Sequence, residues 1–210
     1  MKLYFAPLAC SLATRIALYE ARADAQYAQV DLKAKRLADG SSFLGVNPMG
    51  QVPVLEDGEM RLTENSAVLQ YVAERFPEAA LIPVDFRQRT RVRQWLGFIG
   101  TELHKAVFGP LLDRKASEAV QGYTREKIAL RFSLLEHHLS SNDFLVNSFT
   151  VADAYLATVL NWTVATGIQL SQWPAVHAYH RRMLERPSIA RAVREERALY
   201  QVEQAQAANA

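Results

Sequence analysis

The chain has 210 residues, of which 50% are hydrophobic and 22% are charged. This composition is typical of a folded globular protein and excludes one that is mainly disordered. Its 24 Lys and Arg residues against 22 Asp and Glu leave a net charge of only +2, which argues against a surface built for nucleic acid. Charges interrupt every apolar run before it reaches the roughly 20 residues of a membrane helix, so we expect no membrane partner.

The chain has one cysteine, Cys10, and therefore cannot form an internal disulfide. Its first residues, MKLYFAPLAC, have neither the charged head nor the long apolar stretch of a secretory leader. Because unpaired cysteine is typical of a reducing cytosol, we expect a cytoplasmic protein.

The first 77 residues change their hydrophobic period several times, as expected where strands and helices alternate. Residues 2–6, KLYFA, predict a strand that Pro7 ends. Residues 11–22 predict a helix with one apolar face, and residues 25–32 predict a second strand.

A polar connection with one short helix is expected next, and residues 52–62 then predict two strands around a turn at Asp57 and Gly58. An apolar pattern that includes Val68 and Val72 predicts another helix. The order strand, helix, strand, short helix, strand, strand, helix predicts a mixed four-stranded sheet with three helices. Three residues near the start of the last helix are candidate caps: Thr63, Asn65 and Ser66.

The rest of the chain has helical periodicity almost throughout. Residues 78–86 have the composition of a linker, and residues 87–210 predict an all-helical domain. Thr150 and Asp153 have the spacing of a capping box. The helix that they begin is apolar nearly all round, so we expect it to be buried.

Cys10 has two interpretations. A lone cysteine is most often a small buried hydrophobic residue. Here it falls between a strand that ends at Pro7 and a helix that begins near Ser11, beside unpaired helical N–H groups that lower the pKa of a thiol. Ser11 itself is either the cap of that helix or a residue that contacts substrate.

Two further segments also have an ordinary and a functional interpretation. Pro53 either ends strand pairing or belongs to the few X–Pro bonds that are cis. The helix after the sequence LTENS presents N–H groups that can hold a carboxylate or phosphate, although an ordinary capped helix is the simpler explanation.

The long helix near residue 100 carries two glycines, Gly97 and Gly100, each of which costs about 1 kcal/mol relative to alanine. Both are expected on the same side as His104. A thinned helix face beside a histidine suits either a ligand cleft or close packing against another helix.

The remaining histidines are poor metal ligands. His137 and His138 are adjacent and therefore face different ways on a helix. His177 and His180 could share a face, but no carboxylate partner is evident, and we expect no metal site.

Several segments in the same order resemble the cytosolic glutathione transferases, most closely the bacterial beta class. They are CSL after the first strand, NPMGQVPVL, LTENSAVLQYVAERFP, LHK in the first long helix and FTVADAYL. The resemblance implies a thioredoxin-like domain in residues 1–77, a linker in 78–86, an all-helical domain in 87–210 and usually a homodimer. It also implies glutathione as co-substrate, with no permanently bound cofactor.

The resemblance implies roles for individual residues. Cys10 and His104 match the catalytic residues beside the glutathione sulfur. Val52 and Pro53 match a cis-proline turn whose valine backbone pairs with that of glutathione. The other residues expected to bind glutathione are Glu64 and Asn65 at the γ-glutamyl end, Lys35 at the glycyl carboxylate, Gln51 near that end, and Thr101. The expected acceptor pocket comprises Phe5, Leu8, Ser11, Gly97, Phe108 and Trp162.

Two residues depart from the beta-class pattern. Asn65 stands where glycine is common, and Gly97 replaces an asparagine found in several beta enzymes. We expect these changes to affect affinity and acceptor range.

Three functions follow from this resemblance, in order of preference. The first is conjugation of glutathione to hydrophobic electrophiles, with Cys10 beside the glutathione sulfur. The second is glutathione-dependent thiol–disulfide exchange or peroxide reduction through a Cys10 mixed disulfide. The third is a dimeric, non-catalytic ligand-binding scaffold, since a fold does not fix a function.

Overall fold

The computed structural model describes residues 1–208, and packing divides the chain into two compact units. The first unit joins Met1–Leu81 to Arg186–Ala210, and the second unit is Ile82–Glu185. No helix within residues 1–208 combines the length and the apolar character needed to cross a membrane.

The first unit contains a mixed sheet with strand order β3-β2-β1-β4-β5. The central strand β1 pairs parallel with β2 and antiparallel with β4, and the two outer pairs are also antiparallel. The predicted mixed sheet is therefore confirmed, with one short strand added. The strands are β1 (Lys2–Phe5), β2 (Gln26–Asp31), β3 (Arg36–Leu37), β4 (Val54–Asp57) and β5 (Met60–Leu62).

The added strand β3 follows a tight turn that begins at Asp31. The Asp31 carboxylate accepts hydrogen bonds from the backbone N–H groups of Lys33 and Ala34, both at 2.8 Å. This turn returns the chain so that Leu37 pairs with Val30. A strand of two residues carries no readable period, which is why the sequence did not predict it.

The hairpin between β4 and β5 is shifted by one residue from the predicted turn. Asp57 pairs with Met60, so the loop consists of Gly58 and Glu59. Gly58 has a φ of +61°, a conformation that glycine adopts without steric cost.

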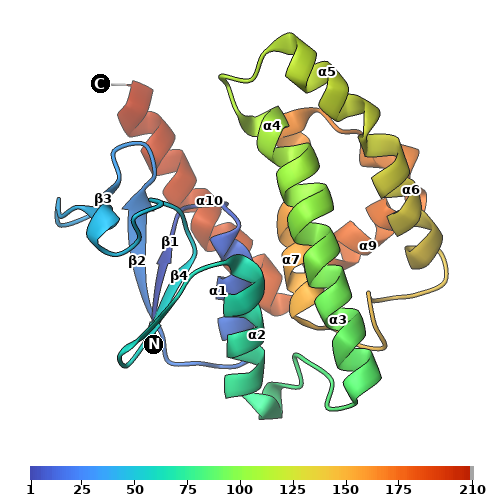
Figure 1. The fold of residues 1–210 in the computed structure, drawn as a ribbon, viewed down its shortest axis with the longest axis horizontal. Coiled ribbons are helices and arrows are strands. Elements are labelled where there is room, and N and C mark those ends of the chain that lie inside the picture. The colour runs from blue at the N-terminus through green and yellow to red at the C-terminus, as the bar shows by residue number, and fades with distance from the viewer. Residues whose placement is uncertain (209–210) are drawn as a thin grey trace. The chain divides into compact units, whose positions relative to one another are not determined.

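Helices α1 (Ser11–Glu20) and α2 (Asn65–Arg75) pack side by side in the first unit (Figure 1). Leu12 and Ile16 of α1 and Val68 and Val72 of α2 are fully buried, as the periodicity predicts, while Tyr19 and Tyr71 are partly exposed. The short helix expected in the polar connection is a single 3₁₀ turn, η1 (Phe43–Gly45), and another turn, η2 (Pro77–Ala79), follows α2. Phe43 lies in one buried cluster with Val52, which ties the segment before β4 to the sheet.

The last helix, α10 (Pro187–Ala208), packs against α1 and belongs to the first unit by packing (Figure 1). Arg186 forms two hydrogen bonds to the Glu20 carboxylate, at 2.6 and 2.7 Å. Farther along, Glu203 accepts a hydrogen bond from Gln29 at 2.7 Å. This differs from the sequence-based division, in which residues 87–210 form one helical domain.

The second unit is entirely helical in its regular structure. Helix α3 continues directly into the π-helical segment η3, and Figure 1 shows both as one green rod. The sequence predicted an ordinary α-helix over this second half. The elements are α3 (Phe86–Phe98), η3 (Ile99–Phe108), α4 (Gly109–Leu112), α5 (Glu118–Glu126), α6 (Ile128–Leu139), α7 (Val151–Leu160), α8 (Thr163–Thr166), η4 (Leu170–Gln172) and α9 (Pro174–Glu185).

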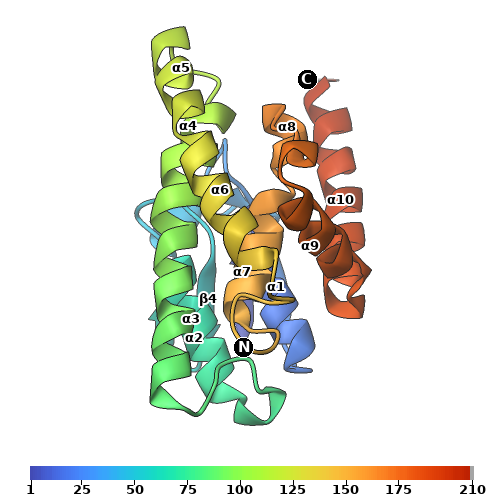
Figure 2. The same cartoon turned by 90° about the vertical axis from the view of Figure 1, so that its right-hand side faces the viewer.

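Helix α7 is the buried centre of the second unit. It contacts α3, η3 and α9, and Figure 2 shows it between α3 and α9. Its predicted capping box is present, since the Asp153 carboxylate accepts from the backbone N–H of Thr150 at 2.9 Å. The same carboxylate accepts from Leu145 N–H at 3.0 Å and from the Tyr179 hydroxyl at 2.9 Å. These contacts fix the start of α7 to two other segments.

Candidate functional site

Cys10 lies at the N-cap position of α1, directly after the turn that follows β1. Its thiol donates a hydrogen bond to the carbonyl oxygen of Val52 at 3.2 Å. Its side chain makes no capping bond, and the residue is partly exposed. A thiol at the start of a helix lies near backbone N–H groups, which favour the thiolate.

Ser11 does not occupy either of its expected roles. The helix cap is Cys10, and the Ser11 hydroxyl exchanges hydrogen bonds with the backbone of Ala6, accepting from its N–H at 3.2 Å and donating to its carbonyl at 3.3 Å. Ser11 has no exposed surface. The hydroxyl therefore stabilises the turn around Cys10 instead of lining an open pocket.

The peptide bond between Val52 and Pro53 is cis, as the resemblance implies. The Val52 side chain is buried, while its carbonyl receives the Cys10 thiol. The Cys10 turn and the cis-proline turn are thus in direct contact, although no sequence period relates them.

Lys35 and Gln51 lie close to the same turn. The Lys35 ammonium group donates to the carbonyl of Gly50 at 2.8 Å, and Lys35 has a φ of 56°. Gly50 has a φ of 59°, and a Cβ atom there would stand 2.8 Å from the Lys35 side chain, so the position favours glycine. Gln51 is exposed, and its carbonyl accepts from Asn47 at 2.7 Å. The predicted glycyl-carboxylate residues therefore lie together beside Val52.

The start of α2 differs from the predicted capping. The N-cap is Glu64, with a φ of 62° and no side-chain cap bond, so neither Thr63, Asn65 nor Ser66 caps this helix. The Glu64 carboxylate side chain is exposed.

Asn65 occupies the first turn of α2 and is 8% exposed. Its side-chain oxygen accepts from the Thr14 hydroxyl at 3.3 Å. Its side-chain nitrogen has no hydrogen-bond partner among the described residues. A buried amide donor without a partner costs free energy, which suits a position where a ligand supplies the acceptor.

In the second unit, the predicted residues Thr101 and His104 lie on the π-helical segment η3. Thr101 is exposed, and its hydroxyl donates to the carbonyl of Gly97 at 3.0 Å. Nδ1 of His104 is 2.7 Å from the Tyr155 hydroxyl, and its ring lies 4.9 Å from the Trp162 ring. π-Helical turns are frequent at functional sites.

His104 is neutral at pH 7. Burial lowers its pKa to about 4, and the nearby Lys105 charge adds to this. A neutral imidazole whose Nδ1 accepts the Tyr155 hydroxyl carries its proton on Nε2. That tautomer presents a hydrogen-bond donor.

Several residues of the expected acceptor pocket are buried. Phe5 is 2% exposed and lies 4.2 Å beneath the guanidinium of Arg15. Phe108 has no exposed surface and packs against Phe132 and Trp162. Both side chains therefore form core contacts, Phe5 with Arg15 and Phe108 with two aromatic rings. Gly97 is exposed and Leu8 is partly exposed.

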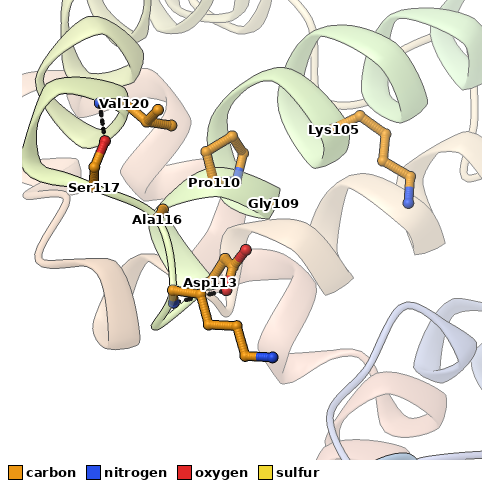
Figure 3. Close-up of a pocket in the computed structure, with 8 residues that line it drawn as sticks. Lys105, Gly109, Pro110, Asp113, Ala116, Ser117 and Val120 are labelled. Carbon is orange, nitrogen blue, oxygen red and sulfur yellow. Dashed lines mark hydrogen bonds between the residues drawn. The ribbon is translucent and has the colours of Figure 1, made fainter.

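The second unit has an open hollow of about 610 Å³ beyond the end of η3 (Figure 3). A short turn borders it, in which the Asp113 carboxylate accepts from Lys115 N–H at 2.8 Å. None of the predicted site residues lines this hollow. Its lining residues are Lys105, Gly109, Pro110, Asp113, Lys115, Ala116, Ser117 and Val120.

Within residues 1–208, no three His, Cys, Asp or Glu side chains are placed to hold a metal ion. Nε2 of His180 is instead 2.9 Å from the side-chain oxygen of Asn161.

Two family models match the chain. Residues 1–74 match the glutathione S-transferase N-terminal domain, and residues 99–187 match the glutathione S-transferase C-terminal domain. The chain is 39% identical to glutathione S-transferase GstA of Escherichia coli O157:H7, over 90% of this chain and 95% of that protein. With a thioredoxin-like unit, a helical unit and these matches, the chain belongs to the glutathione S-transferase family.

Solved structures narrow the class. The bacterial glutathione transferase BphK, in a ternary complex, has a TM-score of 0.90 at 39% identity, covering 93% of this chain and 99% of BphK. The beta-class enzyme of Sphingomonas chungbukensis has a TM-score of 0.88 at 39% identity, covering 93% and 98%. A sphingomonad glutathione S-transferase complexed with glutathione has a TM-score of 0.88 at 38% identity, again covering 93% and 98%. The predicted resemblance to the bacterial beta class is confirmed.

Sequence reasoning missed three residues that contact the predicted site. Tyr155 forms a hydrogen bond with His104. Glu196 accepts a hydrogen bond from the Leu8 N–H, two residues before Cys10, and forms an ion pair with Arg15. Tyr155 lies within the quoted FTVADAYL segment, and its polar hydroxyl in a buried helix was the available signal. Glu196 gave no local signal.

Proposed function

We propose that the protein conjugates glutathione to hydrophobic electrophiles, with Cys10 beside the glutathione sulfur. The observation that carries this proposal is the contact between the Cys10 thiol and the Val52 carbonyl, 3.2 Å apart beside a cis-proline turn. In this proposal the Val52 backbone pairs with the backbone of glutathione, as a short added strand would.

The two ends of glutathione would be held by groups of the first unit. Lys35 and Gln51 take the glycyl carboxylate, where a positive charge is required. Glu64, the unpartnered amide of Asn65 and the N-terminal N–H groups of α2 take the γ-glutamyl end. A sphingomonad relative complexed with glutathione supports this choice of ligand.

The chemistry begins with the glutathione thiolate. The N-terminus of α1 favours the charged form of a sulfur held beside it, and the thiolate is the nucleophile. It attacks an electrophilic carbon, a carbon–sulfur bond forms and the leaving group departs. Nε2–H of His104 would donate a hydrogen bond to a sulfur, with Thr101 nearby on η3. Gly97, which is exposed, and Leu8, which is partly exposed, remain the proposed lining of the acceptor site, with Trp162, 9% exposed, at its buried side.

The test compares turnover of several aromatic halides by the wild type, Cys10→Ala and His104→Gln. We expect wild-type turnover and a fall of about tenfold or more in kcat/KM for His104→Gln, since one charge-assisted hydrogen bond is lost. His137→Gln, on an exposed position, is the matched control and should leave kcat/KM unchanged. No wild-type turnover with any acceptor would refute conjugation.

The second candidate is thiol–disulfide exchange, favoured by a partly exposed single thiol at a helix start. The Cys10 thiolate attacks the disulfide of a glutathionylated substrate, which releases the substrate thiol and leaves glutathione on Cys10. A second glutathione thiolate then attacks that mixed disulfide, forming oxidised glutathione and restoring Cys10. Intact-mass measurement after treatment with oxidised glutathione tests this. A wild type without the added mass of one glutathione would exclude it.

A dimeric, cytoplasmic protein is part of the proposal. The domain limits 1–77, 78–86 and 87–210 are also retained as the functional division. Sedimentation at several concentrations tests the dimer. A non-catalytic scaffold would retain glutathione without any turnover, which the conjugation assay distinguishes.

A further inference from the structure

Glu196 of α10 connects the end of the chain to the turn that carries Cys10. One of its carboxylate oxygens accepts the backbone N–H of Leu8 at 2.8 Å, across 188 residues of sequence. Glu196 has no exposed surface. This hydrogen bond reaches the turn two residues before the cysteine.

Leu8 has an unusual backbone conformation that this contact supports. Its φ is 59°, in the left-handed region that L-residues with a side chain rarely occupy. Such a conformation is unfavourable for a residue with a side chain and persists only where surrounding contacts fix it. Leu8 is the third residue of a turn that is closed by Ala9 N–H bonding to the Ala6 carbonyl at 3.1 Å.

Arg15 forms an ion pair with the other oxygen of the Glu196 carboxylate. Its Nε lies 2.9 Å from that oxygen, but the N–H does not point at it well enough for a hydrogen bond, and the Arg15 side chain is 5% exposed. The guanidinium lies 4.2 Å above each of the rings of Phe5 and Tyr27, which fixes its plane. Arg15 belongs to α1, so one carboxylate joins both the turn before Cys10 and the helix after it.

Burying this carboxylate has a cost, because desolvation raises the pKa of Glu196 to about 7. The groups that face it are Arg15 of α1 and the Leu8 N–H, which lower the pKa, and Glu195 of α10, which raises it. Removing either partner of such a buried pair leaves an uncompensated group.

We propose that Glu196 is a positioning residue for the glutathione site, because its carboxylate fixes the Leu8 turn and thereby sets Cys10 at the start of α1. The inference rests on the proposed function only for its effect on glutathione. Its effect on Cys10 stands on the contacts of the first unit alone.

The first test uses Glu196→Gln, because glutamine offers one acceptor oxygen where glutamate offers two. Either Leu8 or Arg15 must then lose its partner. The pH dependence of Cys10 alkylation reads the pKa of the single thiol without glutathione present. We expect this pKa to rise toward the ordinary value of about 8.5, and KM for glutathione to rise about tenfold.

The direction of the shift separates positioning from simple electrostatics. Loss of a nearby negative charge alone would lower the thiol pKa or leave it unchanged, and either result would overturn the proposal. Glu20→Gln is the matched control, since it removes the negative charge that faces Arg186, the residue before α10, without touching the Leu8 turn. This control should leave both readouts unchanged.

A rescue variant makes the test specific to Leu8. Glycine adopts a positive φ about as readily as a negative one, so Leu8→Gly added to Glu196→Gln should restore part of the lost alkylation behaviour. If the pKa of the Cys10 thiol is shifted as much in the double variant as in Glu196→Gln, then Glu196 does not act through Leu8 and the proposal is wrong.

A last measurement needs no variant, so it remains valid if Glu196→Gln does not fold. Hydrogen exchange of the wild type should show the Leu8 amide strongly protected. An amide that exchanges freely would overturn the proposal. If instead the alkylation shift appears in a protein without conjugating activity, the positioning role holds and the proposed function fails.

Discussion

The imidazole of His104 and the hydroxyl of Tyr155 form a hydrogen bond of 2.7 Å that joins η3 to α7. Tyr155 is 2% exposed, and the two rings meet edge to face at 6.0 Å. The start of α7 is itself fixed by the Asp153 carboxylate. His104 is therefore held by the most buried helix of the second unit.

The variant Tyr155→Phe should lower kcat/KM for conjugation about tenfold. Nδ1 of His104 loses its hydrogen-bond partner in this variant, and the imidazole is no longer held in one tautomer. The free energy of unfolding should fall by about 1 kcal/mol. Conjugation kinetics and urea unfolding measure these changes. The control Tyr123→Phe alters an exposed phenol and should change neither. Full activity in Tyr155→Phe would contradict the role given to His104.

The variant Asn65→Ala should raise KM for glutathione about tenfold while kcat stays close to that of the wild type. Its amide nitrogen has no protein partner to lose, so the free energy of unfolding should change by only about 1 kcal/mol. Thr14→Val removes the partner of the Asn65 oxygen but leaves the amide donor in place, and should affect KM far less. Equal effects of both variants would argue against a direct contact with glutathione.

His180 should make the protein sensitive to mild acid. Burial, with a contribution from His177, lowers its pKa to about 4, whereas the unfolded chain has the ordinary value of 6.5. Between these two pH values the unfolded state binds more protons than the folded state. The contribution of His180 to the free energy of unfolding is therefore fully present above pH 6.5 and is lost as the pH falls toward 4. This contribution amounts to about 3 kcal/mol.

Urea unfolding of the wild type and His180→Gln at pH 7 and pH 4.5 measures the contribution of His180. The free energy of unfolding should differ less between the two pH values in the variant than in the wild type. An identical difference would show that His180 does not contribute.

The variant Asp153→Ala should destabilise the protein by about 3 kcal/mol or more. It removes the acceptor for the Thr150 and Leu145 N–H groups and for the buried Tyr179 hydroxyl. Ser117→Ala removes the exposed cap of α5 and should cost about 1 kcal/mol or less. Thermal and urea unfolding measure the loss of stability in each variant. Equal losses in Asp153→Ala and Ser117→Ala would contradict the prediction.

Local signals predicted much of the fold. The capping box at Thr150 and the start of α1 after Pro7 depend on residues within one turn of each other, so the sequence contains the whole interaction. The same holds for the position of Cys10. These features need no knowledge of distant segments.

Features that depend on distant partners were not predictable in this way. Phe108 was expected in the acceptor pocket, but Phe132 and Trp162 enclose it. The π-helical turn at His104 also escaped the sequence, because apolar spacings of three and four are compatible with both kinds of helix. Glu196 was missed because its partner Leu8 is 188 residues away.

The placement of α10 in the first unit has a consequence for synthesis. Domains generally fold as units while the chain leaves the ribosome, beginning with N-terminal segments. Here the first unit is interrupted by the second, and the helix that completes it is translated last. The sheet and α1 are therefore translated before Glu196 exists to receive the Leu8 N–H. The turn that carries Cys10 is the first part of the site to be translated, and its contact with Glu196 cannot form until α10 has followed.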